Sequence, residues 1–573
     1  MKRALFLPLV LVWVGMACAA PTRSSISEPS GAGGAAQPAR TLVAAVQLEP
    51  KSLAARPLAQ AGTALSLSKR LFNADLTLLD DQLNPYPYLV EALPQLNTDS
   101  WKVFPNGTME TTYRLRPNLT WHDGTPLTAD DFVFAWEVYA KPEVGQASSL
   151  PLKLIARVEA PDVQTVLIRW AQPFAGAGAL QSLSASGATG LPPLPRSILE
   201  PALEAGAQGL INAPFWTVGY VGLGPYKLDR WEPGAFVEAS AFDRHVLGVA
   251  RIQHIQMRFL PDANTALAGM LAGELQLAGD NALRLPQINN LFRQWPSSRG
   301  TMVPQFSSWQ ALHFQSRPDF VSPPPLQDVR VGQALAHAVD RIGINESLFE
   351  GQLPIADGPF PPSSDLGQAA NSMVTKYPFD LGRSEQLMAD AGFAKRAGDF
   401  YVGRGGAAFS AEVRTDFGDY IETLSAVANG WRQAGFEFRE MVVPQAQAQD
   451  LQVKSTYPGV LLSSTSAGEA SLNSMGTDNI PRPENQWRGT AWDGYSNPEL
   501  DRLITAVGAA LDPAVRNQAA ADLVKLYSSE VPAISMFFNI NPWVFTSDLT
   551  GPMLRPAVSN VAWNIHEWEL TAS

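Results

Sequence analysis

Apolar and polar positions along the chain recur with two different periods, which predicts a mixture of strands and helices. In residues 112–116, apolar Tyr113 and Leu115 alternate with polar neighbours, the pattern of a half-buried strand. A helix is predicted to begin after Thr128, because Asp131 follows three residues later and the two side chains can form a capping box. One face of this helix is expected to carry Phe132, Trp136 and Tyr139.

Capping residues mark further helix boundaries. Asp328 can cap a helix whose apolar positions recur every three to four residues, at Val331, Leu335, Ala338 and Ile342. A proline directly after Asn497 and another after Asp512 mark two more helix starts, and Gly392 is suited to end a helix. No sequence repeat is visible, so a solenoid or propeller is not expected. The pattern predicts a mixed α/β or α+β protein in at least two lobes.

Composition narrows the class of protein. The chain has 573 residues, of which 46% are hydrophobic and 17% charged, a globular balance that excludes collagen, coiled coil and wholesale disorder. This length corresponds to about two to four domains. Asp and Glu number 54 against 42 Lys and Arg, and the formal charge of -12 argues against a general nucleic-acid binder.

The first forty residues carry targeting signals. Two basic residues precede a short apolar run, which predicts a secretory signal peptide over residues 1–17. The only cysteine, Cys18, follows directly and resembles the lipidated residue of a bacterial lipobox, although Gly15 stands where leucine is usual. The alternative is a plain signal peptide with an unmodified cysteine. Residues 18–40 are rich in Ala, Gly, Ser and Pro, which predicts a flexible linker behind a lipid anchor.

The residues offer no constellation typical of a catalytic or metal site. The six histidines are scattered, and none lies in a zinc-ligand spacing. Neither a nucleophile elbow nor a phosphate-binding loop is present, and the only cysteine lies in the targeting segment. Carboxylates are adjacent at Asp80-Asp81 and Asp130-Asp131, but the second pair opens a predicted helix, where acids favour the helix dipole. We therefore expect no enzymatic activity, no cofactor and no metal.

Several segments carry motifs in a fixed order. They are residues 88–94 (YLVEALP), 112–117 (TYRLRP), 121–132 (WHDGTPLTADDF), 222–226 (GLGPY), 328–341 (DVRVGQALAHAVDR), 495–501 (YSNPELD) and 530–534 (EVPAI). Together they resemble the large extracytoplasmic solute-binding proteins of peptide/nickel-type ABC transporters, known as family 5, with Gly332 where that family usually has arginine. The glycines at 222 and 224 favour a tight backbone turn rather than ligand contact.

The resemblance implies an α/β, two-lobed periplasmic-binding-protein-like fold, large and type II-like, with an extra subdomain in the first lobe. Such a fold closes around an interlobe cleft by hinge bending. The first lobe is expected over residues 41–260 and again over the C-terminal return, 536–573, with the second lobe over 261–535. The crossings are expected near Leu260-Pro261 and near residues 532–538.

The resemblance also indicates where the ligand binds. Peptide-binding members of the family typically carry an aromatic residue and an aspartate, often before proline, that pairs with the peptide's amino terminus. The corresponding stretch here, residues 461–471, lacks Asp-Pro and offers the hydroxyls of Ser463, Ser464 and Thr465. Glu469 is its only acid, so it is either the replacement for that aspartate or a solvated loop acid.

Two aromatic stretches are further candidates for the cleft. They contribute Ser307, Ser308, Trp309, Trp487 and Trp492. Tryptophans beside hydroxyls and amides suit sugars, peptide side chains or an aromatic ligand. The alternative is that these rings belong to the core or to the lobe interface.

These interpretations together predict an extracytoplasmic substrate-binding lipoprotein of an ABC importer, in the periplasm or on the outer face of the cell membrane. Its ligand is expected to be an oligopeptide or similarly sized solute, delivered to permease subunits by a monomer. Alternatives are a non-peptide ligand such as an opine, an oligosaccharide or a metal chelate, and a sensor without transport. An envelope-tethered hydrolase is a further alternative.

Overall fold

The structure, a computed structural model, describes residues 41–571 except 59–64, 148, 185–188, 297, 396–399, 417, 445, 449 and 555–558. The side chains of residues 307, 470 and 473 are also outside the description. The predicted signal peptide, Cys18 and the predicted linker lie outside the described residues, so they stay predictions. Residues 40–573 form one compact unit.

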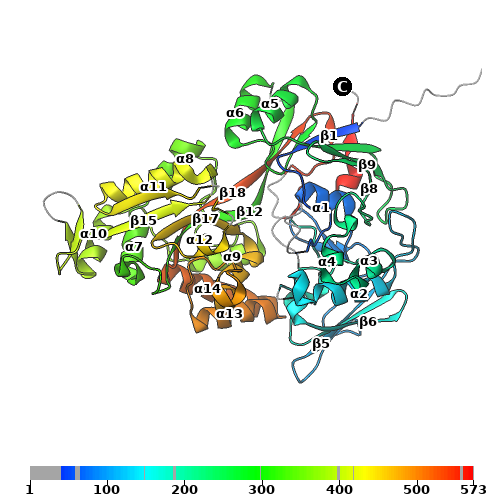
Figure 1. The fold of residues 1–573 in the computed structure, drawn as a ribbon, viewed down its shortest axis with the longest axis horizontal. Helices are drawn as coiled ribbons and strands as arrows, with labels where there is room; N and C mark the ends of the chain where they lie inside the picture. The colour runs from blue at the N-terminus through cyan, green and yellow to red at the C-terminus, as the bar shows by residue number, and fades with distance from the viewer. Residues whose placement is uncertain are drawn as a thin grey trace, which may run out of the picture. The chain divides into compact units, whose positions relative to one another are not determined.

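A ten-stranded mixed sheet runs through this unit (Figure 1). Its neighbouring strands are, in order, β16 (Glu437–Val442), β15 (Ser410–Thr415), β17 (Val460–Ser466), β12 (Gly300–Phe314), β18 (Ala533–Thr546), β11 (Leu277–Ala278), β1 (Thr41–Val46), β10 (His254–Phe259), β9 (Phe236–Ala241) and β8 (Tyr226–Glu232). β15 is parallel to β16 and β17, and β1 is parallel to β10 and β11. β12 is antiparallel to both β17 and β18, so the sheet is mixed.

Smaller sheets and fourteen α-helices accompany this sheet in the described part of the chain. One four-stranded antiparallel sheet contains β4 (Trp101–Val103), β5 (Met109–Arg114), β7 (Thr165–Trp170) and β6 (Ile155–Asp162). Three strand pairs are β2 (Thr77–Leu79) with β3 (Pro85–Pro87), β13 (Phe393–Lys395) with β14 (Tyr401–Gly403), and β19 (Leu549–Thr550) with β20 (Glu569–Leu570). The expected mixed α/β class is confirmed.

The helices divide along the chain into two groups. Before β12 they are α1 (Ser66–Phe72), α2 (Ala129–Tyr139), α3 (Arg196–Glu204), α4 (Ala207–Ile211), α5 (Ala263–Ala272) and α6 (Leu285–Gln294). After β12 they are α7 (Val329–His337), α8 (Arg341–Phe349), α9 (Asp365–Ala370), α10 (Leu381–Asp390), α11 (Ile421–Gln433), α12 (Leu451–Ser455), α13 (Pro498–Ala509) and α14 (Pro513–Glu530). Within the described ranges, no helix combines the length and apolar character needed to cross a membrane.

Most predicted helix starts are confirmed. Thr128 and Asp131 form the predicted capping box at the start of α2. The side chain of Asn497 accepts hydrogen bonds from the first backbone N–H groups of α13, and that of Asp512 does the same for α14. Gly392 has a φ of +90° and follows the end of α10, as expected for a helix stop.

The helix predicted from residue 328 to residue 342 is wrong in its length. Asp328 caps α7 as predicted, but α7 ends at His337. Asp340 then caps a new helix, α8, because its Oδ1 accepts the N–H of Gly343 at 2.9 Å. Ile342 lies in this second helix and is 70% exposed, so it is not part of the apolar face of α7. The three-to-four-residue spacing of apolar side chains continues across the break between α7 and α8, so the spacing alone does not reveal the break.

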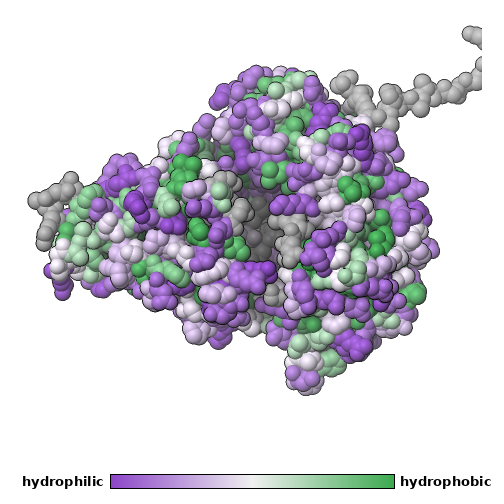
Figure 2. Space-filling view, in the orientation of Figure 1, coloured by the Kyte–Doolittle hydropathy of each residue, from purple (hydrophilic) through white to green (hydrophobic). Residues whose placement is uncertain are grey.

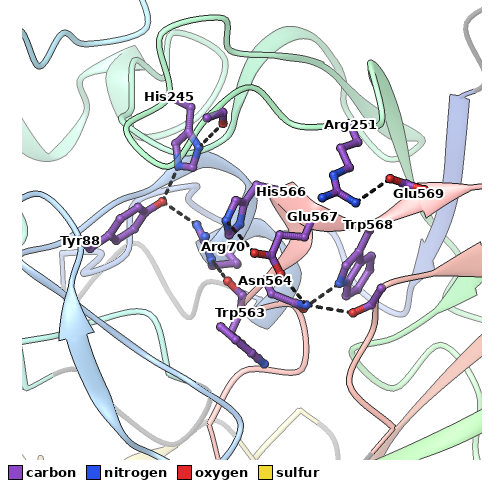
Figure 3. A network of polar contacts seen from close by, with 12 residues as sticks. Arg70, Tyr88, His245, Arg251, Trp563, Asn564, His566, Glu567, Trp568 and Glu569 are labelled. Atoms are coloured by element: carbon purple, nitrogen blue, oxygen red, sulfur yellow. Dashed lines mark hydrogen bonds and ion pairs between the residues drawn. The ribbon is translucent and has the colours of Figure 1, made fainter.

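The C-terminal segment packs against the N-terminal half of the chain. Buried residues of 549–568 belong to the same apolar cluster as α1, α2 and β5. Figure 3 shows the polar contacts at this junction: Arg70 Nε donates to the carbonyl of Trp563 at 2.7 Å, and Arg70 Nη1 donates to the hydroxyl of Tyr88 at 2.7 Å. Tyr88 in turn contacts Nε2 of His245 at 2.9 Å. The predicted return of the C-terminal segment to the first lobe stays a prediction.

One histidine connects two of the sequence motifs. His122 Nδ1 accepts the N–H of Gly222 at 3.2 Å, and its Nε2 lies 3.0 Å from the carbonyl oxygen of Gly224. A Cβ atom on Gly222 would lie 1.9 Å from the carbonyl oxygen of Phe72, so only glycine fits there. The motifs around residues 122 and 222 therefore hold backbone segments together, as the sequence indicated.

The lobe boundaries stay predictions, but packing favours a later first crossing. α5, β11 and α6 share one apolar cluster with Ala45 of β1 and Val544 of β18. Among the described strands, β12 is the first along the chain to join the other half of the sheet, where it pairs with β17. This arrangement favours a crossing within β12 rather than at Leu260-Pro261. The second predicted crossing, near residues 532–538, coincides with the first part of β18.

Candidate ligand-binding cleft

Two long strands, β12 and β18, connect the two halves of the ten-stranded sheet. One half contains β15, β16 and β17, and the other contains β11, β1, β10, β9 and β8. The pairing of β12 with β18 is irregular between these halves, a region that we call the crossing. At one end β18 pairs with β11, and at the other β12 pairs with β17. Between these ends the register of the β12–β18 ladder shifts at Phe306/Ser308 and at Trp309/Ala311. Such bulges bend and twist a strand. Figure 2 shows that this face of the molecule is hollowed between the two halves.

A network of uncharged polar groups lies at this crossing. Asn539 Nδ2 donates to Ser308 Oγ at 2.9 Å and to the hydroxyl of Tyr420 at 3.0 Å, while Gln310 Nε2 donates to Asn539 Oδ1 at 2.7 Å. Burial raises the pKa of Tyr420, and hydrogen bonds from Ser464 and Asn539 oppose that rise. The phenol is therefore neutral at physiological pH. Hydroxyls and amides can both donate and accept hydrogen bonds, which suits a polar ligand.

The carboxyl ends of the parallel strands β15 and β17 lie beside this network. Ligands of open α/β sheets commonly bind outside such strand ends. Asp416 directly follows β15, and its Oδ2 pairs with Lys454 Nζ at 2.6 Å. The same ammonium lies 4.7 Å from the ring centroid of Trp492. Trp492, predicted as a ligand contact, is thus a buried ring beneath an ion pair in this conformation.

The predicted stretch 461–471 lies partly in β17, and most of its polar groups have internal contacts. Thr465 Oγ1 donates to Ser474 Oγ at 2.8 Å, and Ser464 bonds to Tyr420. Ser463 is fully buried, and its hydroxyl has no hydrogen-bond partner among the described residues. Glu469, the candidate amine anchor, pairs with Arg516 of α14. A role for these residues in binding stays a prediction.

The two other predicted tryptophans lie in different surroundings. Trp309 is 1% exposed, and its ring belongs to an apolar cluster that includes Phe538. Trp487 is half-buried, with its ring centroid 6.3 Å from that of Phe320. Ser307 lies in β12, but its side chain is outside the described part of the structure. The structure brings Ser308, Trp309, Ser463, Ser464 and Thr465 together on adjacent strands, with direct pairing of Ser308–Trp309 against Thr465–Ser466.

One ion pair near the crossing was not found from the sequence. Arg284 Nη1 lies 2.8 Å from Oδ2 of Asp419. Arg284 precedes α6, which packs with β1 and β18, whereas Asp419 lies between β15 and α11. These residues are far apart in sequence, and neither stands in a recognisable motif, so no sequence signal could have joined them.

Two charged side chains, Asp280 and Lys69, lie at α1. The carboxylate of Asp280 accepts the N–H groups of Ser66 and Leu67, at 3.1 and 2.9 Å, at the start of α1. Burial raises the pKa of Asp280 despite these bonds. Burial also lowers the pKa of Lys69 to about 8, with the charge of Asp280 opposing the change. The carboxylate of Asp280 thus holds the start of α1.

A small pocket also lies between α7, α14 and the start of β18. Among its lining residues are Arg341, Asp357 and Lys376. Asp357 pairs with Arg341 Nη2 at 3.1 Å and with Lys376 Nζ at 3.0 Å, so these charges compensate one another.

The carboxylate pairs noted in the sequence have structural roles. Asp131 caps α2, and Asp80 Oδ1 accepts the N–H groups of Gln82 and Asn84 in a turn. Among the residues that the structure describes, no group of three or more His, Cys, Asp or Glu side chains is arranged to hold a metal ion.

The fold and the bulged crossing beside a hollow define a two-lobed solute-binding protein. The sequence model of the bacterial extracellular solute-binding proteins, family 5 Middle, matches residues 91–479, more than half of the chain. The chain therefore belongs to the bacterial extracellular solute-binding proteins, family 5, a family of binding proteins, as its motifs indicated.

Known proteins of similar sequence and fold agree with this assignment. The chain is similar to the oligopeptide-binding protein AppA of Bacillus subtilis (strain 168), with 21% identity over 502 residues, which cover 86% of this chain and 85% of that protein. NikZ from Campylobacter jejuni, solved in complex with Ni(L-His), has a TM-score of 0.73 at 20% identity and covers 93% of this chain and 100% of that one. The oligopeptide binding protein from Thermus thermophilus, complexed with a pentapeptide, has a TM-score of 0.72 at 22% identity and covers 92% and 96%. The expected fold is confirmed.

Proposed function

We propose that the chain is the substrate-binding subunit of an ABC importer, which captures an oligopeptide or similarly sized solute in the cleft and delivers it to a membrane permease. The observation that carries this proposal is the bulged crossing of β12 and β18, with its network of hydroxyls and amides. A peptide backbone needs both donors and acceptors, and this network supplies both. The family membership and the similarity to AppA support the same function.

Hinge bending at the bulges is part of this proposal. The first lobe comprises the elements up to α6 and the C-terminal return, and the second comprises the elements between β12 and β18. Closure around the solute gives the permease a conformation to recognise. The receptor acts as a monomer.

Membrane attachment is also proposed, through a lipid on Cys18 after cleavage of residues 1–17. Residues 18–40 then tether the receptor to the periplasmic or outer face of a membrane. Replacing Cys18 by serine is expected to abolish palmitate labelling and membrane association. A Cys18→Ser protein that stays labelled and membrane-bound contradicts the anchor.

A non-peptide solute, such as an opine, an oligosaccharide or a metal chelate, is the second candidate. It is favoured by the ion pair of Glu469 with Arg516, because an acid already paired with a cation is a weaker anchor for a peptide amine. The two candidates differ in ligand and share the binding mechanism.

A thermal-shift screen of residues 40–573 separates these candidates. The pools are peptides, oligosaccharides, opine-like conjugates and metal chelates. Ligand binding to the folded form alone stabilises it by about 2.7 kcal/mol at a hundredfold excess over the dissociation constant. A shift with the peptide pool alone supports the peptide receptor, a shift with another pool alone supports the second candidate, and no shift with any pool contradicts both.

A further inference from the structure

Arg70 of α1 is a fully buried arginine whose hydrogen-bond partners are uncharged. Its side chain is 0% exposed. Nε donates to the carbonyl of Trp563 and Nη1 to the hydroxyl of Tyr88, whereas Nη2 is buried without a hydrogen-bond partner among the described residues. Arginine is almost never fully buried unless its charge is paired, because burying an isolated charge costs several kcal/mol.

Other deeply placed arginines in the described part of the chain do pair with an acid. Arg414, whose side chain is 11% exposed, forms an ion pair with Glu412. Arg341, at 16%, pairs with Asp357. Arg70 is less exposed than either and has no such carboxylate among its described contacts.

The protons around Arg70 can be assigned from the contacts. His245 Nδ1 lies 2.9 Å from the carbonyl oxygen of Gly248 and therefore carries the ring proton, because a carbonyl only accepts. Nε2 of His245 then accepts the hydroxyl of Tyr88, whose oxygen accepts from Arg70. Burial lowers the pKa of His245 to about 3 and raises that of Tyr88, so both side chains are neutral. This chain of hydrogen bonds therefore contains no negative charge to balance Arg70.

Two other buried polar atoms near Arg70 have no hydrogen-bond partner among the described residues, the hydroxyl of Tyr226 and Nδ1 of His566. Burial raises the pKa of Tyr226 and the charge of Arg70 opposes the rise. Burial lowers the pKa of His566 to about 3, and the charge of Arg70 adds to that effect. The ring centroid of His566 lies 5.5 Å from that of His245, and Figure 3 shows the rings of Tyr88 and His566 beside Arg70.

Three segments that are far apart in sequence supply these atoms: α1, the start of β8 and the C-terminal segment. The N–H groups of Leu223 and Gly224 both donate to the carbonyl of Phe72 at 3.1 Å, which joins the end of α1 to the residues just before β8. The bond of Arg70 to Trp563 joins α1 to the C-terminal segment. The unpartnered atoms are thus held by backbone contacts between the segments that carry them.

All three unpartnered atoms can donate a hydrogen bond. The guanidinium and the phenol carry their own protons, and a neutral imidazole carries one proton on either nitrogen. Nε2 of His566 lies 3.9 Å from Oε1 of Glu567, beyond hydrogen-bond distance, so the proton is free to sit on Nδ1. A water molecule would satisfy these donors but would leave the charge of Arg70 unbalanced, whereas a monovalent anion does both.

We propose that Arg70 Nη2, the hydroxyl of Tyr226 and Nδ1 of His566 bind one small monovalent anion, chloride or another halide. The anion neutralises Arg70 and joins α1, β8 and the C-terminal segment. This site is independent of the cleft and of the solute proposed above, so it stands or fails without a peptide.

Glu567 is the alternative source of negative charge. Its side chain is 53% exposed, and its Oε2 accepts a hydrogen bond from Asn564 Nδ2 at 3.4 Å. Solvent screens a carboxylate in such a position, which weakens its interaction with a buried cation. The variant Glu567→Gln distinguishes the two sources of charge.

The first readout is equilibrium unfolding of residues 40–573 in urea at constant ionic strength, with gluconate replaced stepwise by chloride. An anion that binds only the folded form raises the folding equilibrium constant about tenfold for each tenfold rise in chloride above its dissociation constant. We expect this dependence with chloride and with bromide. A folding constant that is the same in gluconate and in chloride overturns the proposal.

Matched variants separate the site from a general salt effect. Tyr226→Phe removes one donor and is expected to weaken chloride binding by about tenfold or more. Tyr457→Phe removes another fully buried hydroxyl without a described partner and is expected to leave the chloride dependence unchanged. Arg70→Met is expected to abolish the dependence, and Tyr226→Phe keeps the test decisive if that variant does not fold. Equal chloride dependence in Tyr226→Phe and Tyr457→Phe overturns the site.

Glu567→Gln is expected to behave as the unsubstituted protein does. If it gains a chloride dependence that the unsubstituted protein lacks, Glu567 balances Arg70 and the inference is wrong.

The second readout locates the ion by anomalous diffraction at the bromine edge, from crystals grown in sodium bromide. A bromide peak in contact with Arg70 Nη2 is expected. Density without an anomalous signal at that position identifies a water, and bromide peaks confined to the surface identify an adventitious ion only; either result overturns the proposal.

Discussion

Trp309 provides a sharp test of the structure, because the sequence places it in the ligand site whereas the structure buries it. Its side chain is 1% exposed and packs in the apolar cluster of the second half. Truncation to alanine removes about 200 Å² of buried surface, or about 5 kcal/mol at about 25 cal/mol per Å². Since unfolded chains already bury part of this area, we expect Trp309→Ala to lower the free energy of unfolding by about 3–5 kcal/mol.

The assay is equilibrium unfolding of residues 40–573 in guanidinium chloride, followed by far-ultraviolet circular dichroism without ligand. Trp487→Ala is the matched control, because its half-buried ring is expected to contribute about 1 kcal/mol or less. A Trp309→Ala protein with the unfolding midpoint of the unsubstituted protein would refute the placement of this ring in the core. Lost ligand binding with full stability would instead make Trp309 a ligand contact.

Two further predictions concern stability. Gly222→Ala is expected to destabilise the fold by at least about 3 kcal/mol in the same unfolding assay, because its Cβ would lie 1.9 Å from a carbonyl oxygen. Gly405→Ala is the control and should be close to neutral, because no atom lies within 4 Å of its new Cβ. Equal unfolding midpoints for the two variants contradict the close approach at Gly222. Burial lowers the pKa of His245 and of His566 to about 3. In the unfolded chain these histidines bind protons below about pH 6.5, whereas in the folded protein they stay neutral down to about pH 3. The free energy of unfolding should therefore fall by about 2 kcal/mol for each histidine between pH 7.5 and pH 5. Replacing His245 by phenylalanine should remove part of this pH dependence, and a free energy of unfolding that stays constant between these pH values contradicts the burial.

Local sequence chemistry predicted local structure well. The capping box of Thr128 and Asp131 and the caps at Asn497 and Asp512 involve neighbours in sequence, so the residues alone determine the contact. Helical spacing failed where a second cap intervened: Asp340 starts a new helix although apolar residues continue at the same interval up to Ile342.

The candidate site was predictable only in part. The motifs identified the family, and residues 308–309 and 463–465 do meet on adjacent strands. Their burial depends on which face of the sheet the helices cover, and alternation along one strand does not reveal that. The pair of Arg284 with Asp419 forms only because α6 and the end of β15 approach each other in the folded chain.

The most direct test of the central claim is native mass spectrometry of residues 40–573 after incubation with an equimolar library of tri- to pentapeptides. Adducts of one peptide per chain are expected, which are retained through buffer exchange and disappear on thermal unfolding. A spectrum of ligand-free protein alone, from a sample whose circular dichroism shows an intact fold and at library concentrations that saturate a micromolar site, contradicts the claim that this chain is a peptide receptor.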